Sequence, residues 1–229
     1  MEMLAHRANV CGPDHLAENT PGSVRAALAS GWGLELDVRR TAGGVFYFSH
    51  DGRPAADAAE ADDICAAIAR YPAATIAMNV KETGYEGDLL AYLDRRGILR
   101  QSVLFDMELV EPVAGATAAL FRQLHPTVRI AARVSDRREP LRRALAIEAA
   151  SIIWLDEFDM LWAEECDIQT LRSRGRSVYA VAPDLHGAAF DRTRARCVEF
   201  ARWGVDAVCT DYPASVQRVL GDLPMGAAA

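Results

Sequence analysis

The chain has 229 residues, of which 51% are hydrophobic and 25% are charged, and its formal net charge at pH 7 is −7. This composition is typical of a globular protein with a sizeable core, and the length fits one large domain or two small ones. The negative charge argues against a broad nucleic-acid-binding surface. No apolar run reaches the roughly 18 residues of a transmembrane helix, and the first residues lack a signal-peptide pattern.

The cysteines are five in number and scattered through the chain, without a CxxC pair: Cys11, Cys65, Cys166, Cys197 and Cys209. An odd set with no regular spacing indicates reduced thiols rather than a disulfide framework. We therefore expect a cytoplasmic protein.

Short apolar runs with strand character alternate with helical patterns along the whole chain. The predicted strands are residues 3–7, 34–39, 75–80, 102–105, 128–134, 151–155, 177–181 and 207–210. The predicted helices after them are residues 22–30, 62–70, 88–96, 111–124, 141–149, 168–174, 192–203 and 215–220. Several of these helices stop at a glycine, as helix C-termini commonly do.

Eight consecutive β/α units in a chain of this length predict an α/β fold of the (β/α)₈ (TIM) barrel type. The alternative is a doubly wound open sheet, but such a sheet rarely needs eight consecutive units, and no GxGxxG turn follows the first predicted strand. We expect residues 1–222 to form a single barrel and residues 223–229 to form a flexible C-terminal tail.

Two carboxylates lie at positions i and i+2 of the second predicted strand, Glu35 and Asp37. Because strand side chains alternate between faces, both would point to the same face. The surrounding residues are apolar, so two buried negative charges need a cation. Oxygen ligands without thiolates suit Mg²⁺ or Ca²⁺ better than zinc. The alternative is a structural ion pair with Arg39 or Arg7.

Further polar residues follow the first and third predicted strands: His6 and Arg7, then Asn79 and Lys81. A short run over residues 45–49 returns His50 toward the carboxylates. In a barrel these residues would meet at the rim formed by the strand ends. A divalent cation together with Arg7 and Lys81 would neutralise a phosphate, and two histidines would supply an acid and a base. A barrel ion pair with Glu35 is the alternative for Lys81.

These residues, in this order, resemble the glycerophosphodiester phosphodiesterase family of the phospholipase C-like phosphodiesterase barrels. The matching pieces are His6-Arg7, Glu18-Asn19-Thr20, Glu35-Leu36-Asp37, His50-Asp51, Lys81 and Thr210-Asp211-Tyr212-Pro213. The resemblance implies a (β/α)₈ barrel, a phosphoric diester hydrolase with a divalent cation, usually Mg²⁺ or Ca²⁺, and a place in lipid metabolism. It implies that His6 and His50 are the acid/base pair, that Glu35 and Asp37 bind the metal, and that Arg7 and Lys81 bind the phosphate.

The chain departs from the family pattern on the third strand, which reads Asn79-Val80-Lys81 where the family usually has Glu-x-Lys. An asparagine carbonyl can also bind Mg²⁺ or Ca²⁺, so Asn79 is the candidate third ligand, but the site loses one negative charge. Only residues 52–61 separate His50-Asp51 from the next predicted helix. The chain is therefore a compact form without the usual insertion.

The sequence thus predicts a metal-dependent phosphodiesterase that cleaves a glycerophosphodiester-like or related small phosphodiester by His/His acid-base catalysis. One alternative is a non-catalytic protein that binds a phosphate or phospho-sugar on the same barrel, and another is a lyase that releases a cyclic phosphate. The expected partner is a small-molecule phosphodiester, with no nucleic acid and no integral membrane segment. The sequence does not define the oligomeric state.

Overall fold

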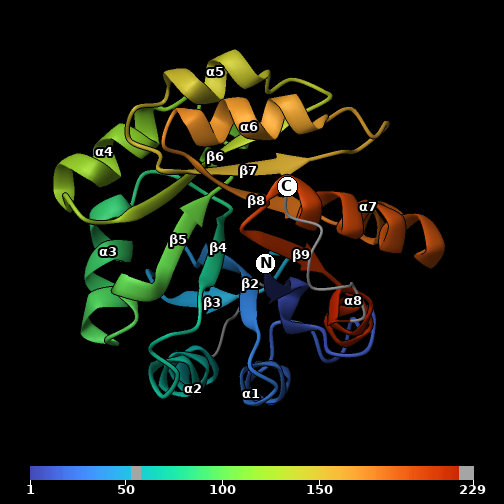
Figure 1. The fold of residues 1–229 in the computed structure, drawn as a ribbon. Helices are drawn as coiled ribbons and strands as arrows, with labels where there is room; N and C mark the ends of the chain where they lie inside the picture. The colour runs from blue at the N-terminus through green and yellow to red at the C-terminus, as the bar shows by residue number, and fades with distance from the viewer. Residues whose placement is uncertain (53–57, 222–229) are drawn as a thin grey trace.

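The computed structural model describes residues 1–52 and 58–221. Within these residues, parallel strands close into a barrel in the order β1-β9-β8-β7-β6-β5-β4-β2, and β2 pairs back with β1 (Figure 1). The barrel strands are β1 (Glu2–Ala5), β2 (Gly33–Arg40), β4 (Ile76–Val80), β5 (Ser102–Phe105), β6 (Arg129–Ser135), β7 (Ile152–Asp156), β8 (Ser177–Val181) and β9 (Ala207–Thr210). The predicted (β/α)₈ barrel is confirmed, and the open-sheet alternative is wrong.

Helices surround the barrel, because each strand is followed by a segment that packs its apolar side against the outer face of the sheet. They are α1 (Pro21–Ala29), α2 (Ala58–Ala69), α3 (Glu86–Arg95), α4 (Ala116–Leu124), α5 (Leu141–Ala146), α6 (Glu165–Ser173), α7 (Phe190–Trp203) and α8 (Pro213–Gly221). Among the described residues, no helix combines the length and the apolar character that crossing a bilayer requires.

The end of β2 extends into a hairpin with β3 (Phe46–Phe48), which is antiparallel to it and pairs Val38 with Phe48. Gly44 turns the chain at φ +88°, a conformation that L side chains rarely adopt. The hairpin carries the chain back to the barrel rim, as the sequence predicted for the segment before His50.

The start of α4 differs from the prediction, which placed a helix over residues 111–124. The helix begins at Ala116, because the Glu111 carboxylate accepts hydrogen bonds from the backbone N–H groups of Gly115 and Thr117. Gly115 has φ +84° and breaks the helical path. Glu111 therefore lies ahead of the helix and satisfies backbone donors near its N-terminus.

The core has two layers, because alternate residues of each strand face the inside of the barrel or the helices. The interior layer includes Leu4, Val103, Phe105, Ile152 and Trp154, all nearly inaccessible to solvent. Trp154 stacks on Phe105 with the ring centroids 3.9 Å apart. These two rings also line the cavity at the carboxyl ends of the strands, so the aromatic core forms part of the cavity wall.

The predicted tail over residues 223–229 lies outside the described residues.

Candidate active site

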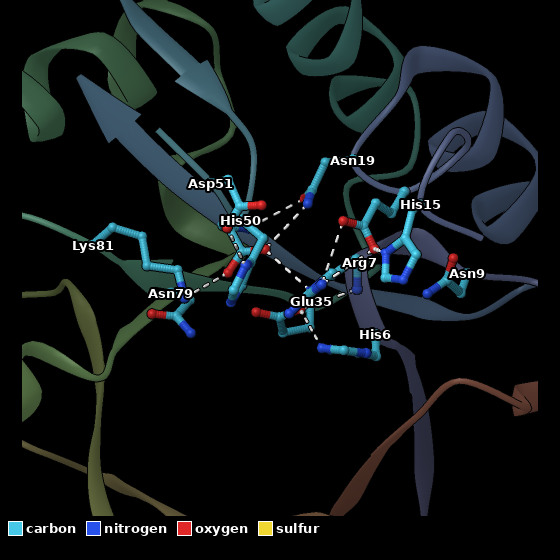
Figure 2. A network of polar contacts seen from close by, with 12 residues as sticks. His6, Arg7, Asn9, His15, Asn19, Glu35, His50, Asp51, Asn79 and Lys81 are labelled. Carbon is cyan, nitrogen blue, oxygen red and sulfur yellow. Dashed lines mark hydrogen bonds and ion pairs between the residues drawn. The ribbon is translucent and has the colours of Figure 1, made fainter. Parts of the chain in front are cut away.

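A cavity of about 200 Å³ opens at the carboxyl ends of the barrel strands. Every site residue predicted from the sequence lines it: His6, Arg7, Glu35, Asp37, His50, Asn79 and Lys81 (Figure 2). The residues come from the ends of β1, β2 and β4 and from the segment after β3. The structure thus brings together side chains that lie up to 75 positions apart in the sequence, from position 6 to position 81.

Asp37 is buried on β2 and is surrounded by positive charge and hydrogen-bond donors. Its carboxylate lies 2.8 Å from Lys81 Nζ and 3.5 Å from Arg7 Nε, and it accepts a hydrogen bond from Asn19 Nδ2 at 3.1 Å. Burial alone would raise the pKa of Asp37, but the charge and hydrogen bond of Lys81 and the charge of Arg7 lower it. Asp37 is therefore held as a carboxylate.

Glu35 is equally buried but has weaker partners. Its Oε2 atom accepts a hydrogen bond from the backbone N–H of Arg7 at 3.0 Å and lies 3.9 Å from His6 Nε2. Burial and the negative charge of Asp37 raise the pKa of Glu35 to about 7. A buried carboxyl group in this state would gain from a nearby cation.

His6 is oriented by a residue from the far end of the chain. Its Nδ1 atom lies 2.8 Å from Asp211 Oδ1, and Asn9 Nδ2 donates to the same oxygen at 2.9 Å. Burial lowers the pKa of His6, but the hydrogen bond to Asp211 and the charges of Glu35 and Asp211 outweigh it and raise the pKa. With Nδ1 on Asp211, Nε2 faces the cavity and Glu35. Such a His–Asp pair fixes the ring and stabilises its protonated form.

His50 is held more loosely than His6. Its Nδ1 lies 2.9 Å from Asp51 Oδ1, and the side chains of these two residues are 42% and 92% exposed. Its backbone carbonyl is fixed, because it accepts hydrogen bonds from the Arg39 guanidinium. The ring therefore stands at the cavity mouth on an anchored backbone.

Asn79 lies beside Asp37 on the neighbouring strand, because β2 and β4 pair in that register. Its Nδ2 atom donates to Asp106 Oδ2 at 3.1 Å, which leaves the Oδ1 carbonyl free of this bond. Two carboxylates and one amide oxygen form a donor set that suits Mg²⁺ or Ca²⁺. Within residues 1–52 and 58–221 no three His, Cys, Asp or Glu side chains form a metal cluster, and the third candidate ligand here is the amide of Asn79. The residues therefore fit a hard cation such as Mg²⁺ or Ca²⁺, held by two carboxylates and one neutral amide oxygen.

The structural alternatives weighed for these charges are partly realised. Arg39 pairs with Glu82 instead of Glu35 or Asp37. Lys81 contacts Asp37 and not Glu35. Arg7 does approach Asp37, while its guanidinium also pairs with Glu18 at 3.2 Å.

The loop after β1 carries unusual backbone conformations. Arg7, Ala8 and Asn19 have positive φ values of 50°, 62° and 55°. Non-glycine residues adopt this region rarely, and strained residues of this kind cluster at functional sites. The turn at Arg7 directs its backbone N–H to Glu35, to which it donates a hydrogen bond. The unusual backbone conformation therefore helps to position one of the two buried carboxylates.

A second group of polar residues lines the same cavity, and the sequence assigned it no catalytic or metal-binding role. Asp106, Arg133, Asp156 and His186 line the wall formed by β5 to β8 and the short helix η4 (Pro183–His186). Each follows or ends a predicted strand, which was the available signal. Their mutual pairing depends on side-chain directions that the pattern of strand ends does not contain.

No protein-family model matches the sequence, and no curated protein matches it. Solved structures resemble it along nearly its whole length. A putative glycerophosphodiester phosphodiesterase from Galdieria sulphuraria superposes with a TM-score of 0.75 at 17% identity, over 96% of this chain and 98% of the other. A glycerophosphoryl diester phosphodiesterase from Parabacteroides distasonis gives 0.71 at 15% identity, over 98% and 88%.

A third similar structure is a phosphodiesterase from Oleispira antarctica in complex with the product sn-glycerol-3-phosphate. Its TM-score is 0.69 at 17% identity, over 97% of both chains. Barrels of other enzymes are less similar, such as the tryptophan synthase α-subunit from Pyrococcus furiosus with a TM-score of 0.55. In fold, the chain is a compact (β/α)₈ barrel of the kind that the glycerophosphodiester phosphodiesterases have.

Proposed function

We propose that the chain is a metal-dependent phosphodiesterase, a phosphoric diester hydrolase acting on a glycerophosphodiester or a related small phosphodiester. The observation that carries this proposal is the convergence of two buried carboxylates, two cationic side chains and the Asp211-bound His6 on one cavity at the barrel's carboxyl end. That end of a TIM barrel is where catalytic residues collect. The likeness in fold to phosphodiesterase structures supports the same reading.

The proposed metal ligands are Glu35, Asp37 and the Oδ1 carbonyl of Asn79, with Mg²⁺ or Ca²⁺ as the ion. The raised pKa of Glu35, about 7, supports this proposal because it marks a buried carboxyl group short of positive charge. Asp37 can hold Lys81 and an ion together, since a carboxylate has about four lone-pair positions. When bound, the ion polarises a phosphoryl oxygen and stabilises negative charge.

Arg7 and Lys81 bind the phosphate in this proposal. Lys81 contacts one oxygen of Asp37 and Arg7 approaches the other, so the charge of each can be shared between the carboxylate and a substrate oxygen. Their charges also stabilise the additional negative charge on the phosphoryl oxygens in the transition state.

His6 takes a proton from the attacking oxygen, and His50 gives a proton to the leaving oxygen. The hydrogen bond that Asp211 accepts from His6 Nδ1 supports the role of His6 as base, because it presents Nε2 to the cavity and stabilises the imidazolium. The position of His50 at the open mouth supports the role of an acid beside a departing alcohol. In a two-step reaction through a cyclic phosphate the two histidines exchange roles.

A second candidate is a protein that binds a phosphate or phospho-sugar without cleaving it. The neutral Asn79 at the third ligand position favours it, since fewer acidic ligands lower the affinity for a divalent ion. Both candidates place an anion on Arg7 and Lys81, so only turnover separates them.

The test is turnover of bis(p-nitrophenyl) phosphate by metal-stripped protein titrated with Mg²⁺, Ca²⁺ and Mn²⁺. The expected result is activity that depends on the added ion and is lost in Glu35→Ala but kept in Glu148→Ala, a matched change at an exposed glutamate. Absence of turnover together with absence of ion binding in calorimetry would favour the binding protein. Analysis of the products of an alkyl phosphodiester by ³¹P NMR then distinguishes a hydrolase from a lyase that stops at a cyclic phosphate.

The cytoplasmic location of the protein stays a prediction.

A further inference from the structure

The guanidinium of Arg39, near the end of β2, holds the backbone of one of the two proposed catalytic histidines. Its Nε and Nη2 atoms both donate to the carbonyl oxygen of His50, at 3.0 and 2.8 Å. Its Nη1 atom bonds to the carboxylate of Glu82. Each of the three nitrogens thus has a partner, and two of them bond the same carbonyl. Because the guanidinium is planar and rigid, this two-pronged contact fixes the position of the carbonyl group closely.

Glu82, the anionic partner of Arg39, is held in its turn. Its Oε2 atom accepts hydrogen bonds from the hydroxyl of Tyr85 at 2.8 Å and from the backbone N–H of Arg40 at 3.3 Å. Glu82 and Tyr85 belong to the segment between β4 and α3, whereas Arg39 belongs to β2. The carbonyl of His50 is therefore fixed from two neighbouring strands at once.

Arg39 itself lies outside the cavity. Glu35, Asp37 and Arg39 occupy alternate positions of β2 and so share one face of the strand. Among the described residues, however, the cavity lining includes Glu35 and Asp37 but not Arg39. His50 does line the cavity. The contact of Arg39 with the His50 carbonyl therefore gives it a route to the reaction that does not need contact with substrate.

The position of the His50 ring depends on its backbone, because the side chain has little else to hold it. The ring bonds only to the carboxylate of Asp51 among the described residues, and that side chain is 92% exposed. Exposed pairs of this kind contribute little to holding a side chain. On the preceding side, the backbone N–H of Ser49 donates to the carbonyl of Asp37 at 3.0 Å. Within residues 1–52 and 58–221, Arg39 provides the hydrogen bonds found to the His50 backbone itself.

We propose that Arg39, supported by Glu82, is a positioning residue that holds His50 where it can give a proton to the leaving oxygen. The proposal rests on the proposed phosphodiesterase function and goes beyond it by naming the residue that sets the place of the acid. A general acid must lie within hydrogen-bond reach of the oxygen that it protonates. A displacement of about 1 Å at such a group can cost about 10²-fold in rate.

The test compares two symmetrical diesters, bis(p-nitrophenyl) phosphate and diphenyl phosphate, in the wild type and in Arg39→Met. p-Nitrophenolate leaves readily without a proton, whereas phenolate is a poorer leaving group and gains more from an acid. The quantity measured is the ratio of kcat for the nitrophenyl diester to kcat for the phenyl diester. Arg39→Met is expected to raise this ratio by about threefold to 30-fold, a part of the contribution of a well-placed acid. The rise should come mainly from slower cleavage of diphenyl phosphate.

Further variants separate positioning from structural damage, which would slow both diesters alike. Arg39→Met/His50→Ala should have the same ratio as His50→Ala, because two residues that act through one another are not additive. Arg40→Met is the matched control, since its guanidinium pairs with Asp88, and should leave the ratio unchanged. Arg39→Lys keeps the charge but not the two-pronged contact, so it should raise the ratio less than Arg39→Met. If the methionine variant does not fold, the lysine variant decides the test.

The outcomes distinguish this positioning role from the function on which it rests. Turnover of neither diester by the wild type removes the phosphodiesterase proposal and the positioning role with it. The positioning role alone is overturned by a wild-type ratio in the deciding Arg39 variant or in His50→Ala, or by an effect of Arg39→Met that persists without His50. Turnover of the nitrophenyl diester alone by the wild type also overturns it, because no acid then assists the leaving group.

Discussion

The imidazole of His6 and the carboxylate of Asp211 lie 2.8 Å apart although 205 positions separate them in the chain. The two residues follow β1 and β9, which pair in parallel with Ala5 opposite Thr210. Closure of the barrel therefore places the first predicted catalytic histidine beside a residue of the last predicted motif. Burial tends to raise the pKa of Asp211, but the hydrogen bond and charge of His6 outweigh it and lower the pKa.

Replacing Asp211 with asparagine should slow turnover without unfolding the protein. Asparagine can keep the Asn9 contact but cannot stabilise a protonated imidazole. The expected loss in kcat is about 10²- to 10⁴-fold, the usual contribution of an acid/base group. Steady-state kinetics on a phosphodiester and a thermal melt of the same sample provide the two readouts.

Asp206→Asn is the matched control for this change. Asp206 lies at the other end of β9 and pairs with Arg172 near the surface. We expect its activity to equal that of the wild type. A folded Asp211→Asn enzyme with full activity would contradict the role given to the His6–Asp211 pair.

Lys81 provides the second prediction, and it is the single lysine of the chain. Lys81→Met removes the ammonium group from Asp37 and from the proposed phosphate, and should reduce kcat/KM by about tenfold to 100-fold, as the loss of a charged hydrogen bond implies. Lys81→Arg should recover only part of the loss, because a planar guanidinium cannot replace a compact ammonium at one oxygen.

The control for Lys81 is Arg40→Met. Arg40 ends β2, but its guanidinium pairs with Asp88 and packs on Phe46 and Tyr85, none of which lines the cavity. Its loss should affect kcat/KM much less than the loss of Lys81. Equal losses in the two variants would show that the rim responds to any removed charge, and Lys81 would have no specific part in binding the phosphate.

Much of the fold could be predicted from the sequence, because a barrel of parallel strands repeats one local pattern. The apolar strands, the glycines that end helices and the polar residues after each strand can all be recognised locally. Recognising them does not require knowing which segments contact one another. The same regularity placed Glu35 and Asp37 on one face and His6 and Lys81 at the rim. All of them do line the cavity.

What could not be predicted depends on contacts between distant side chains. Asn19 was visible in a motif, but the motif did not show that its amide bonds both the side chain and the backbone N–H of Asp37. Asn19 makes these bonds from a backbone with φ 55°, which a sequence pattern does not predict. The wall of Arg133, Asp156 and His186 was visible only as polar strand ends. The start of α4 was misplaced because the propensity of residues 111–115 gives no sign that Glu111 bonds backbone N–H groups ahead of the helix.

Asn79→Glu should tighten binding of Mg²⁺ or Ca²⁺. The variant adds a third negative charge beside Glu35 and Asp37, and ligand charge is a main determinant of affinity for these ions. We expect a decrease in Kd of about tenfold, equivalent to about 1.4 kcal/mol, in titration calorimetry of the metal-stripped protein. Asn79→Ala should weaken binding. Equal affinity in all three proteins would exclude position 79 from the ligand set.

The last prediction concerns stability, and it depends on Glu108 in the loop after β5. Glu108 Oε1 accepts a hydrogen bond from the Arg133 backbone N–H at 3.0 Å. Its Oε2 is buried and has no hydrogen-bond partner in the described part of the chain. Burial raises the pKa of Glu108 from 4.5 to about 7. The folded protein thus binds a proton there between these two pH values while the unfolded chain does not.

Stability must therefore fall as pH rises from about 4.5 to about 7 through this group. Glu108→Gln removes the buried charge, keeps an acceptor for the Arg133 N–H and should be more stable than the wild type above pH 7. The gain is about 2 kcal/mol once the partial exposure of Glu108 is allowed for, and it should vanish below pH 4.5. Urea unfolding of both proteins from pH 4 to pH 8 measures it, with the exposed Glu148→Gln as control. A difference that does not change with pH would rule out Glu108 as the titrating group.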